Sequence, residues 1–523
     1  MKLNKIFNSL SIAAVALLAT ACNDTDAKYS IPDVDAPQYI SAKLATEKPI
    51  FFGETTIQVN FNKKIGFATK NTSQITINGK SVDKALVIGA DTVLTVTTDV
   101  DFCNTLTLHI PAGIIVGPQG KTYDQAIDES FTIKAMPSNA ATAVTQQLGW
   151  GWNLGNHFDT SGEAIEKGWG YWDQVGIMTA APFQTLATAG AKTVRMPVTW
   201  TDHMDDSYTI NADYLNEVAG AVDLALNAGL NVILNTHHDS FETDLGNAAT
   251  DKETYLKDST IIVKLWEQVA TKFANYSDKL IFETFNEIHA GDNWNGGTAD
   301  EYALLNKWNQ WALDAIRKTG SNNATRWIGI PGYAANIDLT IANMVLPQDP
   351  ANKLIVAVHN YDPYFFCTTP LNSDGTLQYN SWGHNADPDH SVSNANEDYI
   401  INLLYKLRTA YIENNIPCYL GEYGCVWYPT DRANAFRAYY LEFFCRAANL
   451  AGIPMFIWDN NGKGAVSLND DGTVNEAFGY IDHATGEWLN DSETMVPTMI
   501  KACTSSDSSY NFQTIWDKSP KAN

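Results

Sequence analysis

The sequence has little charge and few basic residues. Charged side chains make up 18% of its 523 residues, and 34 Lys and Arg against 59 Asp and Glu give a formal net charge of −25. A negative field of this size repels phosphate backbones and anionic headgroups. We therefore expect no nucleic-acid partner, whereas a neutral polymer is compatible with the charge. Fifteen Trp and 23 Tyr supply flat amphipathic rings that suit stacking on an uncharged ligand.

Cysteines and long hydrophobic runs are also scarce. Seven cysteines in a chain of this length are too few for a disulfide scaffold, and no pair has the CxxC spacing of a zinc or redox site. After the N-terminus, no segment approaches the roughly 18 uninterrupted apolar residues that a membrane helix needs. We therefore expect folded globular domains.

The N-terminus has the residue order of an export signal. A basic start leads into an apolar run over residues 10–18 and then into Ala19-Thr20-Ala21-Cys22. The small residues before Cys22 resemble a bacterial lipobox, in which the signal is cleaved before the cysteine and the thiol carries a lipid. We therefore predict a signal peptide over residues 1–21 and lipidation at Cys22. An ordinary cleaved signal with an incidental cysteine is the alternative.

A lipid on Cys22 predicts an exported protein anchored to the outer membrane. Asp24 and Asp26 follow the cysteine and resemble the surface-export signals of some Gram-negative lipoproteins. We therefore expect the cell surface, with the periplasmic face or secretion as alternatives. Residues 22–37 are polar with two prolines, which predicts a flexible tether.

Residues 38–135 contain short runs in which apolar and polar residues alternate. Ile57, Val59 and Phe61 show the period-two pattern of half-buried strands, and Asn78-Gly79 is a hairpin-turn signal. About seven such runs in a hundred residues predict a small all-β sandwich that resembles bacterial Ig-like modules. Because the segment has no cluster of Trp residues, we expect a spacer rather than a carbohydrate-binding module.

Residues 136–505 alternate short apolar strands with helical stretches. In one helical stretch, apolar residues recur at every fourth position from Tyr214 to Leu226, with Asn211 and Gly229 as caps. This rhythm predicts an α/β fold, a (β/α)8 TIM barrel. A doubly wound sheet is the alternative, but no GxGxxG or Walker loop follows any strand. The eight predicted strands cover residues 150–154, 193–196, 231–235, 280–285, 327–330, 354–358, 417–420 and 454–457, and residues 506–523 are left as a C-terminal tail.

The residues at the ends of these strands are rich in functional groups. They include Arg195, His237, His238, Asn286, Glu287, His359, Tyr361, Glu422 and Trp458, and catalytic groups of TIM barrels lie at the carboxyl ends of strands. Taken singly, most of them fit a packing or ion-pair role. Glu287 and Glu422 are harder to dismiss, because a carboxylate that follows an apolar strand must be paired or used to offset its desolvation. Two carboxylates at one barrel mouth can supply the nucleophile and the general acid of glycosidic bond cleavage.

Seven short motifs occur at these strand ends in a fixed order. They are Gly151–Asn156, Val194–Pro197, His237-His238, Phe285–Glu287, His359–Tyr361, Gly421–Gly424 and Trp458–Asn460. Their residues and their order resemble glycoside hydrolase family five over about residues 145–500. His157 departs from the family pattern, because relatives commonly carry Thr at this position. The resemblance therefore does not predict the sugar contacts near His157.

The resemblance implies a retaining mechanism, with Glu287 as general acid/base and Glu422 as nucleophile. We expect their oxygens to lie within about 5.5 Å of each other. We also expect Arg195 and Tyr361 to hold the negative charge of Glu422. The other implied substrate-binding residues are Asn156, His237, His238, Asn286, which suits the sugar 2-hydroxyl, His359, and Trp458, which suits the floor beneath the sugar. No metal or other cofactor is implied.

The stretch from Phe282 to Glu287 and the run from His359 to Tyr364 look most like those of endo-β-1,4-glucanases, including enzymes that act on mixed-linkage glucan and xyloglucan. The expected partner is therefore a neutral β-linked polysaccharide, and the expected state is a monomer. An endo-β-1,4-mannanase is the alternative within the family. Further subsites are expected from some of the loop tryptophans Trp169, Trp172, Trp200, Trp294, Trp382 and Trp427, of which about half are expected in the core.

Two functions of other classes remain as alternatives. A metal hydrolase could use His237, His238, Asp239 and His359, but adjacent residues of a regular strand point to opposite faces, so His237 and His238 are not expected to share a metal. A non-catalytic cell-surface glycan-binding protein could use the same barrel. Such proteins usually lack a catalytic carboxylate, and both are present here.

Overall fold

The computed structural model describes residues 35–46, 50–68, 72–82, 85–89, 91–162, 164 and 170–522. The predicted signal peptide, the predicted lipidation at Cys22 and most of the predicted tether lie outside these ranges. Contacts along the backbone divide the chain into two units, which are described separately. Within the described ranges, no helix has both the length and the apolar character that crossing a membrane requires.

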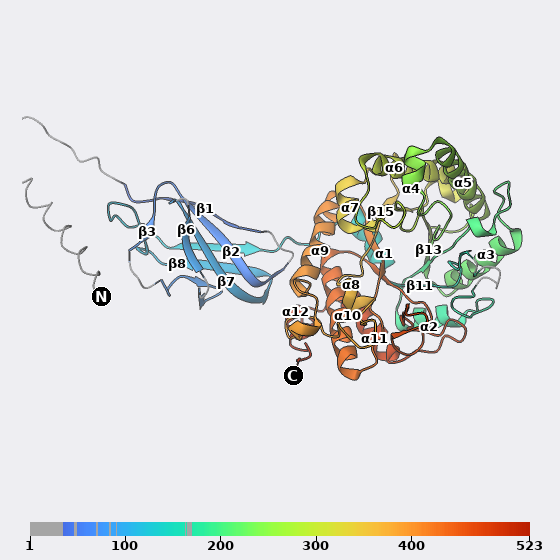
Figure 1. The fold of residues 1–523 in the computed structure, drawn as a ribbon. Helices are drawn as coiled ribbons and strands as arrows, with labels where there is room; N and C mark the ends of the chain where they lie inside the picture. The colour runs from blue at the N-terminus through green and yellow to red at the C-terminus, as the bar shows by residue number, and fades with distance from the viewer. Residues whose placement is uncertain are drawn as a thin grey trace, which may run out of the picture. The chain divides into compact units, whose positions relative to one another are not determined.

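The first unit is built mainly from short strands (Figure 1). Two four-stranded sheets have the orders β1-β2-β7-β6 and β10-β8-β4-β5, and β3 pairs with β9. Ile57, Val59 and Phe61 of β2 are all buried, because a period of two places them on one face of the strand. The all-β prediction is confirmed, and the Ig-like class stays a prediction. The strands are β1 (Tyr39–Leu44), β2 (Phe51–Phe61), β3 (Gly66–Phe67), β4 (Thr76–Ile77), β5 (Lys80–Ser81), β6 (Ala85–Gly89), β7 (Val93–Cys103), β8 (Thr105–Ile110), β9 (Ile115–Val116) and β10 (Ile127–Thr132).

The tight turn between β4 and β5 is the one expected from the sequence. Asn78 and Gly79 have φ angles of 50° and 76°, and β4 and β5 pair antiparallel on either side of them. A two-residue loop with positive φ at both positions is a type I′ turn, which favours Asn followed by Gly. The hairpin signal is therefore confirmed.

The second unit contains a closed barrel of eight strands surrounded by helices (Figure 1). Each strand pairs in parallel with the next one in the chain, and β18 closes the barrel against β11. The predicted TIM barrel and its eight strands are confirmed; the largest difference is in β15, which continues past Ile330 through an irregular pairing. The strands are β11 (Trp150–Asn153), β12 (Thr193–Met196), β13 (Asn231–Asn235), β14 (Leu280–Glu283), β15 (Ile328–Asn336), β16 (Leu354–His359), β17 (Cys418–Tyr423) and β18 (Met455–Ile457).

The helices begin and end at residues that favour those positions. In α3, the side chain of Asn211 accepts hydrogen bonds from the backbone of Asp213 and Tyr214, and it thereby satisfies donors that a helix start leaves free. The helices are α1 (Ala140–Leu148), α2 (Ala181–Ala189), α3 (Ala212–Asn227), α4 (Leu245–Thr250), α5 (Lys252–Lys272), α6 (Ala299–Lys318), α7 (Ile337–Asn343), α8 (Tyr364–Cys367), α9 (Glu397–Ala410), α10 (Asp431–Ala451), α11 (Ser492–Thr504) and α12 (Phe512–Trp516). Short additions are η2 (Thr201–His203), η3 (Ser321–Ala324), η4 (Pro388–His390), η5 (Ile412–Asn414) and the strands β19 (Ser467–Leu468) and β20 (Val474–Asn475).

The segment that the sequence leaves as a tail contains α12. Phe512 and Ile515 of this helix are 2% and 0% exposed, and both belong to the main hydrophobic core of the barrel unit. Their burial removes apolar surface from water and so holds the segment in place. The residues after 505 are therefore part of the folded unit.

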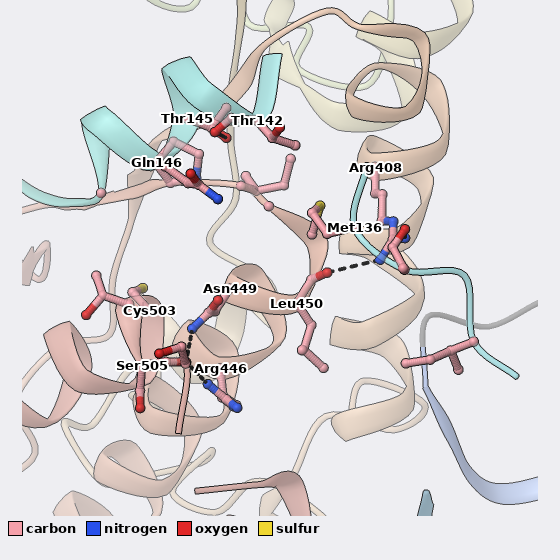
Figure 2. A pocket seen from close by; sticks show the side chains of 18 of the residues that line it. Met136, Thr142, Thr145, Gln146, Arg408, Arg446, Asn449, Leu450, Cys503 and Ser505 are labelled. Carbon is pink, nitrogen blue, oxygen red and sulfur yellow. Dashed lines mark hydrogen bonds between the residues drawn. The ribbon is translucent and has the colours of Figure 1, made fainter. Parts of the chain in front are cut away.

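A cavity of about 570 Å³ lies at the amino-terminal ends of the barrel strands, next to Gly149 and Pro454, which precede β11 and β18. Figure 2 shows Arg408 and Arg446 among its lining residues. Arg408 donates to the carbonyl of Leu450 at 3.1 Å, and Arg446 donates to that of Ser505 at 2.8 Å. These carbonyls lie at the ends of α10 and α11, where a helix lacks its own donors. The two arginines therefore stabilise helix ends.

Candidate active site

A second, larger cleft of about 730 Å³ opens at the carboxyl-terminal ends of the strands. Nine of the ten side chains predicted for catalysis or substrate binding line it: Asn156, His237, His238, Asn286, Glu287, His359, Tyr361, Glu422 and Trp458. The tenth, Arg195, is fully buried beneath the cleft. The topology explains this convergence, because parallel strands that close into a barrel bring their carboxyl ends to one mouth.

Glu422 lies within β17, rather than after the strand as the sequence suggested. Pairing between β16 and β17 sets His359 directly opposite Glu422. Arg195 Nη1 donates to Oε1 of Glu422 at 2.7 Å, and the Tyr361 hydroxyl donates to Oε2 at 3.0 Å. Both carboxylate oxygens are therefore held, and the contacts expected from Arg195 and Tyr361 are present.

The charges around Glu422 keep it ionised. Burial alone raises the pKa of this carboxyl, but the nearby positive charges of His359 and Arg195 and the hydrogen bonds outweigh burial, so the pKa lies below its ordinary value. Burial alone lowers the pKa of His359, but Glu422 and Glu287 together raise it. Glu422 therefore remains negatively charged at lower pH than an ordinary glutamate does.

Glu287 is more open to the cleft than Glu422. Its side chain is 21% exposed, against 7% for Glu422. Nδ1 of His359 lies 2.6 Å from Oε1 of Glu287 and 3.8 Å from Oε1 of Glu422. One oxygen of each glutamate and a ring nitrogen of His359 all lie within 4.8 Å of one another. The carboxylate separation is thus within the expected limit of about 5.5 Å.

Sequence reasoning missed the residues that hold Arg195. Glu283 accepts from Nη2 of Arg195 at 2.7 Å, and it also accepts from Asn235 at 3.0 Å and from the Tyr419 hydroxyl. Asn153 accepts from Nη1 of Arg195 at 3.0 Å. The signal for Glu283 was a carboxylate inside an apolar strand, and the desolvation argument applies there as it does at Glu287.

The Glu283 carboxylate is expected to be important for stability. Glu283→Ala leaves the buried guanidinium of Arg195 without one of its two carboxylate partners, and breaking a buried ion pair in this way costs about 3–5 kcal/mol. Asp338→Ala is the matched control, because the Asp338–Lys406 pair has side chains 65% and 52% exposed and such pairs contribute at most about 1 kcal/mol. Urea unfolding of both variants measures the difference. Equal losses would contradict the assignment.

Glu242, also missed, connects two predicted residues. It accepts from Nδ2 of Asn286 at 3.2 Å, and its other oxygen lies 3.0 Å from Nδ1 of His238. Burial alone lowers the pKa of His238, but its hydrogen bond to Glu242 raises that pKa to about 9. Arg195 meanwhile donates to Oδ1 of Asn286 at 2.8 Å. The Asn286 amide is therefore fixed at both ends, next to Glu287.

The geometric argument against shared metal ligation by His237 and His238 is wrong. It assumed a regular strand, but β13 ends at Asn235, and the two histidine rings lie 4.5 Å apart between centroids. Together with Asp159 they place three candidate ligand atoms within 4.8 Å of one another.

Trp458 follows β18 and forms part of the cleft wall. Its ring lies nearly parallel to that of His237, at 5.9 Å between centroids and 10° between planes. A side chain at Gly155 would place its Cβ 2.7 Å from Cζ2 of Trp458, so only glycine lets the loop after β11 approach the indole. Gly155 therefore lets the loop pack closely against the ring.

The loop tryptophans divide as expected into core and surface residues. Trp200, Trp382 and Trp427 are at most 4% exposed. Trp172 and Trp294 are 37% and 48% exposed, and Trp294 lines the cleft. Trp169 lies outside the described residues.

The sequence matches a known protein family over most of the barrel unit. A family model described as cellulase, glycosyl hydrolase family 5, matches residues 155–464. The chain belongs to this family. Endoglucanase A of Clostridium longisporum is 33% identical to this family 5 enzyme over 372 residues, which are 68% of this chain and 65% of that protein. The match thus spans less than two thirds of that relative.

Two solved structures extend the comparison. A Bacteroidetes-affiliated family 5 cellulase linked with a polysaccharide utilization locus is 36% identical to this enzyme, with a TM-score of 0.67, and the match covers 74% of this chain and 99% of that one. A broad-specificity endoglucanase from Bacteroides salanitronis is 39% identical, with a TM-score of 0.63, and the match covers 71% of this chain and 96% of that one. Both matches support a family 5 glycoside hydrolase of the endoglucanase type.

Proposed function

We propose that this family 5 enzyme is a retaining endo-β-1,4-glucanase that hydrolyses neutral β-glucan by double displacement. The observation that carries the proposal is the separation of at most 4.8 Å between an oxygen of Glu287 and an oxygen of Glu422. Retaining glycosidases hold their two carboxyl groups about 5–5.5 Å apart, whereas inverting enzymes need about 6.5–9.5 Å to admit a water between carboxylate and sugar. The geometry favours direct attack on the sugar.

In the first step, an ionised oxygen of Glu422 attacks the anomeric carbon while Glu287 gives its proton to the glycosidic oxygen. The bond to the leaving sugar breaks, and a covalent ester joins the remaining sugar to Glu422. Arg195 and Tyr361 hold the attacking carboxylate in one orientation. The Asn286 amide, fixed by Arg195 and Glu242, is placed to bond the sugar 2-hydroxyl as the ring flattens.

In the second step, water releases the sugar. Glu287 now carries no proton and takes one from a water molecule as the oxygen of that water attacks the anomeric carbon. The ester bond to Glu422 breaks, and the carboxylate returns to its starting charge. Two displacements at one carbon restore its original configuration.

The substrate is proposed from the relatives and from Asn286. The related proteins named endoglucanase support β-1,4-glucan, including mixed-linkage glucan and xyloglucan. Mannan, the alternative, differs from glucan by an axial 2-hydroxyl, which moves the group that Asn286 is placed to bond. A site built for one hydroxyl position discriminates strongly against another.

Initial rates on five polymers test this substrate class. We expect lichenan, xyloglucan and carboxymethylcellulose to be cleaved, and the best of them to exceed a pure β-mannan by more than about tenfold. Reducing-end assays at equal polymer mass give the comparison, and glucomannan serves as a mixed control. Faster cleavage of mannan than of every glucan would support the mannanase alternative, and no cleavage of any polymer would support the binding-protein alternative.

A further inference from the structure

Exposed aromatic rings gather around the mouth of the barrel. Four large aromatic side chains among the described residues are more than a third exposed, namely Trp172, Trp294, Tyr364 and Phe365. Trp294 and Tyr364 line the cleft, and Trp172 packs on His238, which also lines it. Phe365 is 52% exposed and lies next to Tyr364 without lining the cleft. Its exposure therefore calls for a separate explanation.

The local structure holds Phe365 outward. The single-turn helix α8 buries Phe366 and Cys367, and Phe366 packs on Tyr428 and Tyr440 with centroid distances of 5.5 and 5.7 Å. With these two residues anchored, Tyr364 and Phe365 face solvent, each 52% exposed. A fully apolar side chain gains stability from burial, so a phenylalanine held at the surface presents an apolar ring that a ligand can cover.

The ring of Phe365 is also fixed in orientation. It stacks on Tyr379, with 5.5 Å between centroids and 19° between planes. It meets Tyr364 edge to face at 5.9 Å and 77°. The three rings thus form a continuous aromatic strip, made of Tyr364, Phe365 and Tyr379, which begins in the cleft and leads away from it.

We propose that this aromatic strip binds the part of a β-glucan chain that extends beyond the catalytic cleft. The inference rests on the proposed function, because a polymer substrate must leave the cleft at its ends. Tyr364 belongs to both the cleft and the strip, so a chain that passes Tyr364 meets Phe365 next. Pyranose rings present apolar CH faces that stack on flat aromatic rings, and no charge is needed for a neutral chain.

The test measures binding by an inactive enzyme, so that turnover does not interfere. In a Glu422→Gln background, affinity for barley mixed-linkage glucan is measured by affinity electrophoresis and affinity for cellotriose by calorimetry. We expect Phe365→Ala to weaken binding of the polymer about three- to tenfold and to leave cellotriose within about twofold. Phe365→Tyr, which keeps a flat ring, should retain polymer binding. Val345→Ala is the control, because Val345 is 65% exposed and lies between α7 and β16, at the opposite end of the barrel.

The outcomes separate the strip from the catalytic proposal. Equal weakening of cellotriose and polymer would show that Phe365 supports the cleft and would overturn the strip. Unchanged polymer binding in Phe365→Ala, or an equal loss of polymer binding in Val345→Ala, would also overturn the strip. Thermal unfolding of Phe365→Ala checks that the variant is folded, and if it is not, Phe365→Leu, which keeps apolar volume but lacks a flat ring, takes its place and should show the same loss of polymer binding. If the parent binds neither ligand, the proposed function fails and the strip fails with it.

Discussion

Glu422→Ala is expected to lower the turnover of β-glucan by about 10⁴-fold or more, the scale of loss when a covalent catalyst is removed. The reason is that the first displacement has no other ionised oxygen positioned behind the anomeric carbon. Added azide should restore part of the rate, because it fits the space that the side chain vacates. Since azide then attacks once from that side, the product should be the α-glycosyl azide. Proton NMR of the product gives its configuration.

The alanine variant also removes a partner of Arg195, so its fold must be checked. Glu422→Gln keeps the shape of the side chain and should be equally inactive without azide, and circular dichroism of both variants gives the control. A β-glycosyl azide from Glu422→Ala would reverse the roles of the two glutamates. Full activity in either variant would remove Glu422 from the mechanism.

Glu287→Ala is expected to slow the hydrolysis of natural polysaccharide by about 10²–10⁴-fold, the usual contribution of a general acid. Formation of the glycosyl ester from an aryl glycoside with an activated leaving group should be nearly unaffected, since such a group departs without a proton. Release of the ester should then become limiting, because water has lost its base. A burst of the aryl alcohol in rapid-mixing experiments measures both steps.

Azide again discriminates between the roles. In Glu287→Ala it attacks the glycosyl ester and should give the β-glycosyl azide, the opposite anomer to the one expected from Glu422→Ala. The control is Glu301→Ala, a glutamate in the first turn of α6 that does not line the cleft. An equal loss on polysaccharide and on the activated substrate would argue that Glu287 is not the acid.

The sequence was sufficient for the barrel because its strands are short segments dominated by apolar residues that alternate with helical stretches. The segment at residues 231–235 is an example, with identical predicted and observed bounds, since Val232, Ile233 and Leu234 are all fully buried. The residues that line the barrel mouth were predicted from their positions, because a side chain that directly follows a barrel strand lies at the carboxyl-terminal mouth. That rule located Glu287, His359 and Trp458.

Functional residues inside strands and in long loops were not predicted from the sequence. Glu283 occupies the last position of β14 and was counted with the apolar run, although it is the carboxylate that anchors Arg195. Glu476 lines the cleft from the loop after β20, and burial raises its pKa, yet nothing in its neighbouring sequence marks it. Its position depends on how the loop folds over the barrel, which is set by contacts between residues far apart in the chain.

The position of His359 between the two glutamates has a consequence for kinetics. Nδ1 of His359 lies 3.8 Å from Oε1 of Glu422, and each group shifts the pKa of the other, so removing a proton from one alters the tendency of the other to ionise. When sugar is esterified to Glu422, its negative charge disappears, and the imidazole loses the anion that most favours its protonation. The inflections of a pH–rate profile that come from His359 and Glu422 therefore belong to the pair as a coupled titration, and assigning them to single residues requires a separate measurement for each enzyme form.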